Sequence, residues 1–420
     1  MKSFPEPGKG TPPMDGWKGA VALLVAFERG REHLDDLLEK HPPGRDHGLV
    51  METFRQWFRI DRLLQERLRK PPRPRVRALL RLALAEVLWH GLDRAAAVVH
   101  HTVECGRGLG LSPMELRFLN GVLRAVVREE ARFAELRADP SAAMPEWLWQ
   151  RWCRRFGHER ARELCRWNER MPPWYVRMTE HPLWAEATPF VGFYRVRGKH
   201  AQAALAALAE GRAYAQDPFA AIPVDLLDPR PGETIHDYCA APGGKSREIA
   251  FRMKEQGRLL ALDRPGPRSQ RLEQNLRHLD PACFLQIRSS LEAVTPQQLG
   301  GPADGVLVDV PCSNTGVIAR RPDVKVRLRE CDIAAFAELQ LALLEKAAGH
   351  VRTGGRLVYS TCSLEEEENE SVVGRFLSRN KGWVLRRRRL SFPPEAGHDG
   401  GGAFLLTSAE GHQEFEETPR

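Results

Sequence analysis

The sequence predicts a multi-domain chain: an N-terminal all-α bundle, a small α+β connecting domain and a C-terminal α/β domain with a mostly parallel sheet. Over roughly the first 135 residues, apolar positions recur every three or four residues, the spacing of amphipathic helices. From about residue 220, short apolar runs alternate with helical stretches, which is typical of a parallel sheet covered on both faces. Because 420 residues exceed one core of ordinary size, we expect domains at 1–138, 139–220 and 221–420.

The helical region shows no strand signals. Ser112 and Pro113 suit the N-cap and first residue of its last predicted helix. Apolar stripes occur at 20–40, 48–70, 75–91, 95–108 and 115–127. The segment 138–147 is a plausible linker, and 147–200 mixes helical and strand patterns. The predicted strands of the last domain are 234–238, 258–263, 284–288, 305–310 and 355–360, with 383–390 and 403–408 as an antiparallel edge.

Composition and cysteine spacing exclude several classes of protein. No apolar run approaches the roughly 18 residues of a membrane span, and no cleavage site follows the apolar segment 20–27, so we expect neither a membrane protein nor a signal peptide. The eight cysteines form no CxxC pair, which argues against a metal site and a disulfide framework and favours the reduced cytoplasm.

The basic residues are mostly arginine. Lys and Arg number 63 against 55 Asp and Glu. This excess is consistent with phosphate binding or with a GC-rich genome. The basic residues cluster at 67–77, 151–156 and 386–389, which favours nucleic acid modestly, although each cluster alone could be a solvated face. If 386–389 is a strand, two of its four arginines face away from any one partner.

The stretch "DYCAAPGGKS" (237–246) follows the first predicted strand and suits a cofactor site. Gly243 and Gly244 allow a ligand close to the backbone, and the helix behind them offers free N–H groups. Neither the dinucleotide fingerprint nor the phosphate-binding P-loop pattern is present. Asp263, about twenty residues later, suits the hydroxyls of a ribose, so S-adenosylmethionine is favoured over NAD. The alternative is a structural turn followed by an Asp that caps a helix.

Two cysteines follow predicted strand ends, in "VDVPCS" and "STCS". Because neighbouring parallel strands end at one edge of the sheet, Asp309, Cys312 and Cys362 are expected to share a crevice. A thiolate that adds to carbon 6 of a pyrimidine makes carbon 5 able to attack a methyl donor, and a carboxyl group can stabilise the ring. The base must be flipped out to be reached. The spacing leaves open which cysteine attacks. A methyltransferase of exocyclic amines would need a second proline and an aromatic residue after Asp309.

These motifs resemble a known family. "DYCAAPGGK", "VDVPCSNTGVI", "RRPDVK" and "GGRLVYSTCSLEEEENE" are similar to successive motifs of the RNA cytosine-5 methyltransferases of the NOL1/NOP2/Sun type. Segments 215–233 and 397–406 also resemble parts of that family, and segments 79–90 and 118–129 resemble a NusB-like RNA-binding domain. The resemblance implies a Rossmann-like methyltransferase domain at 221–420 that uses S-adenosylmethionine.

The resemblance also implies roles for individual residues. Cys362 is expected to be the nucleophile, Cys312 to assist product release and Asp309 to contact the flipped cytosine. The residues expected to hold the cofactor are Cys239, Ala240, Ala241, Pro242, Gly243, Gly244, Lys245, Asp263, Arg268 and Asp309. The expected partner is RNA, with 16S ribosomal RNA favoured over tRNA, and no metal, no membrane and a monomeric chain are expected.

Three departures from the family pattern keep a second hypothesis open. The Asp usual after the third strand reads Ser289–Ser290, the Gly usual after the PCS motif is Asn314, and an expected Arg-Xaa-Asn reads Arg177–Met178–Thr179. The second hypothesis is an RNA-binding assembly factor with a weakened cofactor pocket. The acidic run Glu365–Glu368 is interpreted as charging the first turn of the following helix, with general base catalysis as a weaker alternative.

Overall fold

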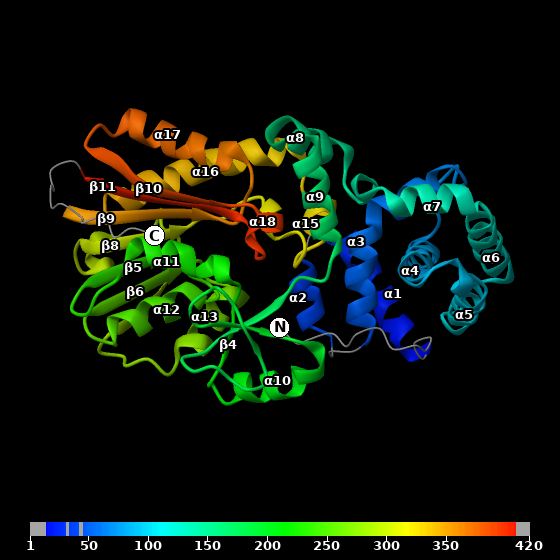
Figure 1. Ribbon diagram of the computed structural model, residues 1–420, viewed down its shortest axis with the longest axis horizontal. Helices are drawn as coiled ribbons and strands as arrows, with labels where there is room; N and C mark the ends of the chain where they lie inside the picture. Colours follow the sequence, from blue (N-terminus) through cyan, green and yellow to red (C-terminus); the bar gives the residue numbers. More distant parts are fainter. Residues whose placement is uncertain (1–13, 31–32, 42–44, 409–420) are drawn as a thin grey trace.

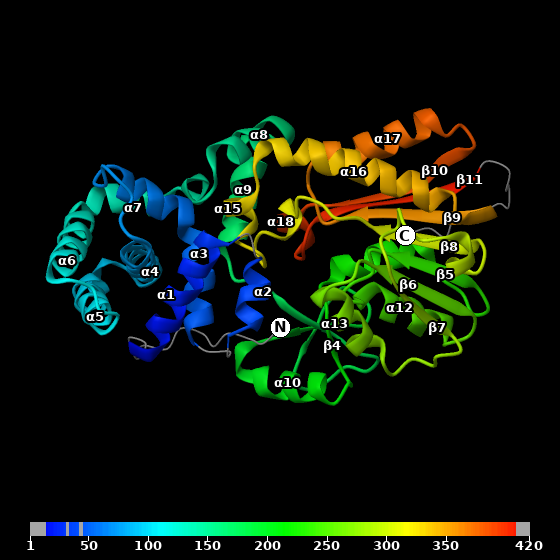
Figure 2. The same ribbon diagram turned by 180° about the vertical axis from the view of Figure 1, so that it is seen from behind.

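The computed structural model describes residues 14–30, 33–41 and 45–408 (Figure 1). A helical bundle occupies one end of the elongated molecule and a large sheet the other, with the connecting region between and beneath them (Figures 1 and 2). The predicted multi-domain fold class is confirmed. Among the described residues, no helix is long and apolar enough to cross a membrane.

The N-terminal bundle packs around α4, whose residues are nearly all buried. Ser112 caps α6 as predicted, since its hydroxyl accepts from the Glu115 N–H and the Glu115 carboxylate accepts from the Ser112 N–H. The apolar stripe at 20–40 forms two helices rather than one. The bundle comprises α1 (Met14–Arg29), α2 (Leu34–Glu39), α3 (Arg45–Gln65), α4 (Pro74–His90), α5 (Ala95–Gly108), α6 (Pro113–Arg128) and α7 (Glu130–Ala138).

The connecting region has three α-helices and a small antiparallel sheet of order β2-β3-β1-β4. The segment predicted as a linker does join two helices, but Pro140, Ala142 and Ala143 are buried in a 3-10 turn between domains. The elements are α8 (Glu146–Phe156), α9 (His158–Glu169), β1 (Trp174–Arg177), β2 (Glu186–Ala187), β3 (Phe193–Val196), α10 (Ala201–Ala209) and β4 (Tyr214–Ala215).

The C-terminal sheet has seven strands in the order β10-β11-β9-β8-β5-β6-β7. The five strands from β9 to β7 are parallel, and β11 and β10 add the predicted antiparallel edge. The strands are β5 (Thr234–Tyr238), β6 (Arg258–Asp263), β7 (Phe284–Arg288), β8 (Ala303–Asp309), β9 (Val351–Thr361), β10 (Trp383–Ser391) and β11 (Gly401–Ser408).

Helices cover both faces of this sheet (Figure 1). One face carries α16 (Glu330–Ala348) and α17 (Glu370–Arg379), and the other carries α11 (Ile222–Leu227), α12 (Gly244–Met253) and α13 (Pro267–Leu276). The short helices are α14 (Pro296–Leu299), α15 (Val324–Arg327) and α18 (Pro393–Ala396). Burial on both faces explains the continuous apolar runs of the central strands.

Candidate active site

The carboxyl ends of β9, β8 and β5 lie side by side and deliver the predicted site residues to one crevice. The Cys312 and Cys362 sulfurs are 3.2 Å apart, so the two loops meet as the strand-end argument predicts. Cys312 is buried and Cys362 is half-buried. The hydrogen bond with Cys362 and burial both raise the pKa of the Cys312 thiol well above its ordinary value, so this thiol stays protonated at neutral pH.

One buried carboxylate joins the two cysteine loops. Glu368 accepts hydrogen bonds from the Ser313 N–H (2.8 Å), the Gln340 amide (2.9 Å) and the hydroxyls of Ser313 and Ser363. Each serine directly follows one of the two cysteines. The Gly316 N–H also donates to the Cys362 carbonyl at 3.0 Å. The distance between the two sulfurs is therefore fixed by a shared anchor rather than by either loop alone.

Asn314, where the family usually has glycine, adopts the left-handed backbone conformation with φ of 61°. Asparagine tolerates this region better than most residues other than glycine. Its amide donates to the Cys312 carbonyl at 2.7 Å and its side-chain oxygen lies 3.1 Å from the Cys362 sulfur, as an acceptor for the thiol. The departure from glycine thus adds a polar contact to the predicted nucleophile.

The Asp309 carboxylate is oriented through both of its oxygens. The Lys245 ammonium donates to one oxygen at 2.7 Å, and the Ser360 hydroxyl donates to the other at 2.5 Å. Burial alone would lower the pKa of Lys245, but the Asp309 carboxylate outweighs burial and the net shift is upward. Lys245 therefore stays cationic and links the glycine loop to the cysteine crevice.

The glycine loop is held open by backbone conformation and by two side chains. Gly243 has φ of 101°, and a Cβ there would lie 2.9 Å from a Leu272 methyl group, so only glycine fits. The Ala241 N–H donates to Asp263 at 2.8 Å, and Arg268 donates to the Ala241 carbonyl at 2.6 Å. The predicted cofactor residues from Cys239 to Lys245, Asp263 and Arg268 thus form one connected unit.

Two polar side chains beside this loop are buried without partners among the described residues. They are Asp237, through one carboxylate oxygen, and Gln216, through both polar atoms of its amide. The Gln216 amide nitrogen lies 3.2 Å from the position of a Cβ on Gly244. Because buried polar groups are nearly always hydrogen-bonded, these atoms fit a loop that receives a polar ligand.

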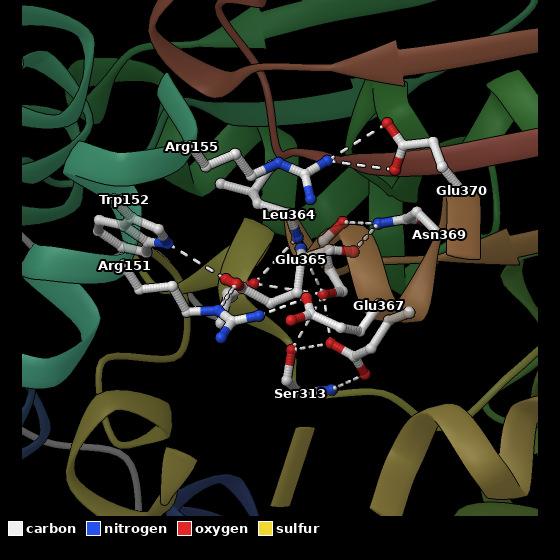
Figure 3. A network of polar contacts seen from close by, with 12 residues as sticks. Arg151, Trp152, Arg155, Ser313, Leu364, Glu365, Glu367, Asn369 and Glu370 are labelled. Carbon is white, nitrogen blue, oxygen red and sulfur yellow. Dashed lines mark hydrogen bonds and ion pairs between the residues drawn. The ribbon is translucent and has the colours of Figure 1, made fainter. Parts of the chain in front are cut away.

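The acidic run after Cys362 ends in the 3-10 turn Glu366–Glu368 ahead of α17, so its interpretation as the first turn of the following α-helix was wrong. Glu365 and Glu368 are fully buried, and α17 begins only at Glu370. Arg151 of α8 pairs with both Glu365 and Glu367, and the Trp152 indole donates to Glu365 at 3.2 Å (Figure 3). The run therefore ties the Cys362 loop to the connecting domain, because Glu365 and Glu368 point inward while Glu366 is exposed.

Comparison with known proteins identifies the family. The sequence model of the 16S rRNA methyltransferases RsmB/F matches residues 224–403, and that of the NusB family matches 47–128. Ribosomal RNA small subunit methyltransferase B of Serratia proteamaculans is 32% identical over 389 residues, covering 86% of this chain and 89% of that protein. The Pseudomonas putida protein of the same name is 31% identical over 427 residues, covering 94% and 96%. The chain belongs to this family. It is therefore an enzyme, a methyltransferase.

Solved structures show the same fold. The crystal structure of PH0851 has a TM-score of 0.80 and 23% identity, and the match covers 96% of this chain and all of that one. NSun6 from Pyrococcus horikoshii with SFG has a TM-score of 0.55 and 21% identity, and the match covers 63% of this chain and 98% of that one.

The other departures from the RsmB/F pattern lie outside the crevice. Ser289 and Ser290 are half-buried after β7, and no carboxylate occupies those positions. Arg177 of the connecting sheet donates to Glu248 at 2.6 Å and stacks on Phe193, so it acts structurally. All four arginines 386–389 on the edge strand β10 are exposed. Among the described residues, no group of three or more His, Cys, Asp or Glu side chains is placed to hold a metal ion.

Proposed function

We propose that the chain transfers a methyl group from S-adenosylmethionine to carbon 5 of a cytosine in RNA, with 16S ribosomal RNA as the substrate. The thiol pair carries the proposal, since Cys312 and Cys362 lie 3.2 Å apart beside the Lys245–Asp309 pair. Methylation of an oxygen or an exocyclic amine needs no thiol, whereas carbon 5 of a pyrimidine becomes nucleophilic once a thiolate has added to carbon 6.

The geometry supports Cys362 as the nucleophile. Cys312 is buried and its thiol is held protonated by its hydrogen bond to Cys362, whereas Cys362 is half-buried and is the more accessible of the two thiols. The Cys362 thiolate adds to carbon 6 of a cytosine that has been flipped out of its stack. The Lys245 ammonium then stabilises the negative charge that develops on the ring during the addition, and Asp309 contacts the polar edge of the ring.

Product release uses the second thiol. After carbon 5 has gained the methyl group, a base removes the carbon 5 proton, and the bond between carbon 6 and the Cys362 sulfur breaks. Cys312, 3.2 Å from that sulfur, is placed to donate a hydrogen bond to the departing thiolate. This step restores the free enzyme and explains why two thiols share the crevice.

The cofactor would lie on the glycine loop. S-adenosylmethionine supplies an electrophilic sulfonium methyl group when bound. One carboxylate oxygen of Asp263 accepts from the Ala241 N–H, and the other can accept hydrogen bonds from the hydroxyls of a ribose. The unpartnered Asp237 oxygen and Gln216 amide offer hydrogen bonds to a polar ligand beside Gly244.

Trapping of the covalent intermediate tests this proposal. Cys362→Ala should abolish methyl transfer, and Cys312→Ala should accumulate a protein–RNA adduct that survives denaturation. Bisulfite sequencing of 16S ribosomal RNA from cells with and without the gene should locate one modified cytosine. The absence of an adduct with either variant would contradict the two-thiol mechanism, and a modified cytosine found only in tRNA would move the substrate to tRNA.

The proposed setting is the cytoplasm, with a single chain as the working unit. A thiol nucleophile has to remain reduced, which the cytoplasm ensures. Every group invoked above comes from one chain. Size-exclusion chromatography with light scattering should therefore give the mass of a monomer, and a stable dimer would contradict this part of the proposal.

A further inference from the structure

Among the described residues, Lys245 and a second cation interact electrostatically with Cys362, and the reaction above uses only Lys245. The other is Arg321, in the loop that follows Cys312. The Gly316 N–H donates to the Cys362 carbonyl at 3.0 Å, and the Arg321 N–H donates to the Val317 carbonyl at 2.9 Å. Arg321 therefore lies one turn of chain beyond the point where the two cysteine loops touch.

Arg321 differs from its neighbour Arg320 in how its donors are used. Arg320 donates to Asp217, Asp399 and the Pro173 carbonyl, at 2.6, 2.6 and 2.9 Å, and its side chain is 14% exposed. Arg321 makes one ion pair, from Nε to Asp35 at 3.0 Å, and its side chain is 27% exposed. Its terminal amino groups donate to no residue that the structure describes. Arg320 therefore has a structural role, whereas the terminal amino groups of Arg321 are available to donate hydrogen bonds to a ligand.

The partner of Arg321 comes from the helical domain. Asp35 lies on α2, which sits between the bundle and the C-terminal domain (Figure 2). Asp36 of the same helix pairs with Arg271 of α13 at 3.3 Å. The domains are also joined by Lys325, which is 1% exposed and donates to the Arg55 and Ala143 carbonyls, both at 2.7 Å. The position of Asp35 beside the crevice is therefore set by domain docking.

We propose that Arg321 binds a backbone phosphate of the RNA next to the target nucleotide, and that the helical domain sets the position of its guanidinium through Asp35. This inference rests on the proposed function for its substrate. A guanidinium has five donors in a planar fork, so the edge away from Asp35 can hold a phosphate with two hydrogen bonds. A flipped base leaves its flanking phosphates displaced, and phosphate contacts fix such a backbone in place.

The Arg321 guanidinium remains protonated, and therefore positively charged, at any pH at which the protein is folded and active. Burial alone would lower the pKa of Arg321, but the carboxylates around it, Asp35 and Asp323 first, outweigh burial and the net shift is upward. Asp35 thus orients a permanent cation rather than neutralising a titrating one.

The salt dependence of RNA binding tests the phosphate contact. The full-length Cys362→Ala protein would bind transcribed 16S ribosomal RNA over a range of salt, with Arg321→Gln and Arg321→Lys added in turn. Arg321→Gln should weaken binding about tenfold and reduce the slope of log K against log[salt] by roughly 0.7 to 0.9, the value for one lost phosphate contact. Arg321→Lys should keep the slope. A wild-type slope in Arg321→Gln, or a loss of S-adenosylmethionine binding instead, would overturn the assignment.

A second variant tests the positioning role of Asp35. Asp35→Asn keeps the arginine charge, so the salt slope should stay as in the wild type, while kcat falls about fivefold and KM for RNA changes little. Arg271→Gln is the matched control, because it cuts the ion pairs of α2 through Asp36 and Glu39 from a side chain of similar exposure, 30%, and leaves Arg321 and Asp35 in place. It should lower kcat by less than about twofold and leave KM and slope unchanged, because Lys325 still holds the docked domains together. An unchanged kcat in Asp35→Asn, or an equal fall in Arg271→Gln, would overturn this part.

These outcomes are separate from those of the proposed function. Failure of cytosine-5 chemistry would appear as an absent adduct in Cys312→Ala, whatever the salt slope. Failure of the phosphate contact would appear as an unchanged slope in Arg321→Gln, whether or not the adduct forms.

Discussion

The loops after β8 and β9 each bring a cysteine and then a serine to the crevice, and Glu368 accepts hydrogen bonds from both serines. Beyond this shared anchor they differ. The β9 loop turns back within six residues, and Asn369 donates to the Ser363 and Glu365 carbonyls at 2.9 Å, so most of its contacts are local. The β8 loop runs on to Lys325, which is bound by backbone groups of the helical and connecting regions.

This difference separates two kinds of rigidity. The loop of the predicted nucleophile is fixed by its own residues and by α8 of the connecting domain, whereas the loop of the predicted release thiol also depends on the docking of the helical domain. Damage to the first should therefore impair covalent bond formation. Damage to domain docking should instead impair the steps that depend on RNA position and product release. The predictions below test this division.

The largest effect is expected from Glu368→Ala, because it removes the anchor that both loops share. Several buried donors would lose their acceptor, among them the Ser313 N–H and the hydroxyls of Ser313 and Ser363. Each buried unpaired group costs ~1–3 kcal/mol, so the free energy of unfolding should fall by about 4 kcal/mol. Urea unfolding measures this loss, and adduct formation should fall at least about a hundredfold.

Glu368→Gln is the matched control for that variant. Its amide oxygen can still accept two hydrogen bonds, so stability should fall by roughly half as much and some adduct should remain. Wild-type stability in Glu368→Ala would show that the two loops hold their positions independently, and the comparison above would be wrong.

Arg151→Met should affect only the β9 loop. It leaves the fully buried Glu365 without its cation, and breaking a buried ion pair from one side costs ~3 kcal/mol. The double variant Arg151→Met with Glu365→Gln removes the stranded charge and should recover most of that stability. Urea unfolding of the wild type, Arg151→Met, Glu365→Gln and the double variant measures the cycle. If the double variant is less stable than Arg151→Met alone, the unpaired charge of Glu365 is not what destabilises Arg151→Met.

Much of the fold could be predicted because its signals are local. Strands β5, β6 and β7 match the predicted ranges residue for residue, since buried apolar runs of the parallel sheet are bounded by turn residues. The meeting of Cys312 and Cys362 could also be predicted, because neighbouring parallel strands end at one edge. The split of 20–40 into two helices was missed, since the apolar stripe continues across the break.

The supporting contacts of the site could not be predicted in the same way. Periodicity carries no information on which distant residue faces a strand end. The ion pairs Arg151–Glu365 and Asp35–Arg321 could therefore not be predicted from the sequence. The run of glutamates was misread because acidic residues before a helix usually charge its first turn. One feature of the sequence could have predicted the shared anchor. A serine follows each cysteine, and two buried hydroxyls that lie close together need a hydrogen-bond acceptor.

Asp237 at the end of β5 offers a contrast to both cysteine loops, since it is buried with one oxygen unpaired. Burial raises its pKa from 3.8 to about 7, although Ser246 and Lys245 oppose the shift. Between about pH 4 and pH 7 the folded state therefore binds a proton that the unfolded state does not, and stability falls as pH rises through this window. Asp237→Asn should abolish that fall and gain ~2 kcal/mol at pH 8.

Urea unfolding at pH 5 and pH 8 measures this effect. Asp237→Asn and the wild type should differ little at pH 5 and most at pH 8. A wild-type stability that rises between these pH values, with no gain in the variant, would mean that an unseen partner stabilises the Asp237 carboxylate.

The smallest effect concerns Asn314, the residue that joins the two cysteine loops directly. Asn314→Gly restores the residue usual in the family and suits φ of 61°, so stability should change by less than about 0.5 kcal/mol. Asn314→Ala should lower the free energy of unfolding by ~1–2 kcal/mol. Alanine is strained in the left-handed conformation, and it cannot donate the hydrogen bond to the Cys312 carbonyl. Urea unfolding separates the two variants. If alanine and glycine are equally stable, the backbone of the β8 loop relaxes on substitution, and its position then depends on domain docking alone.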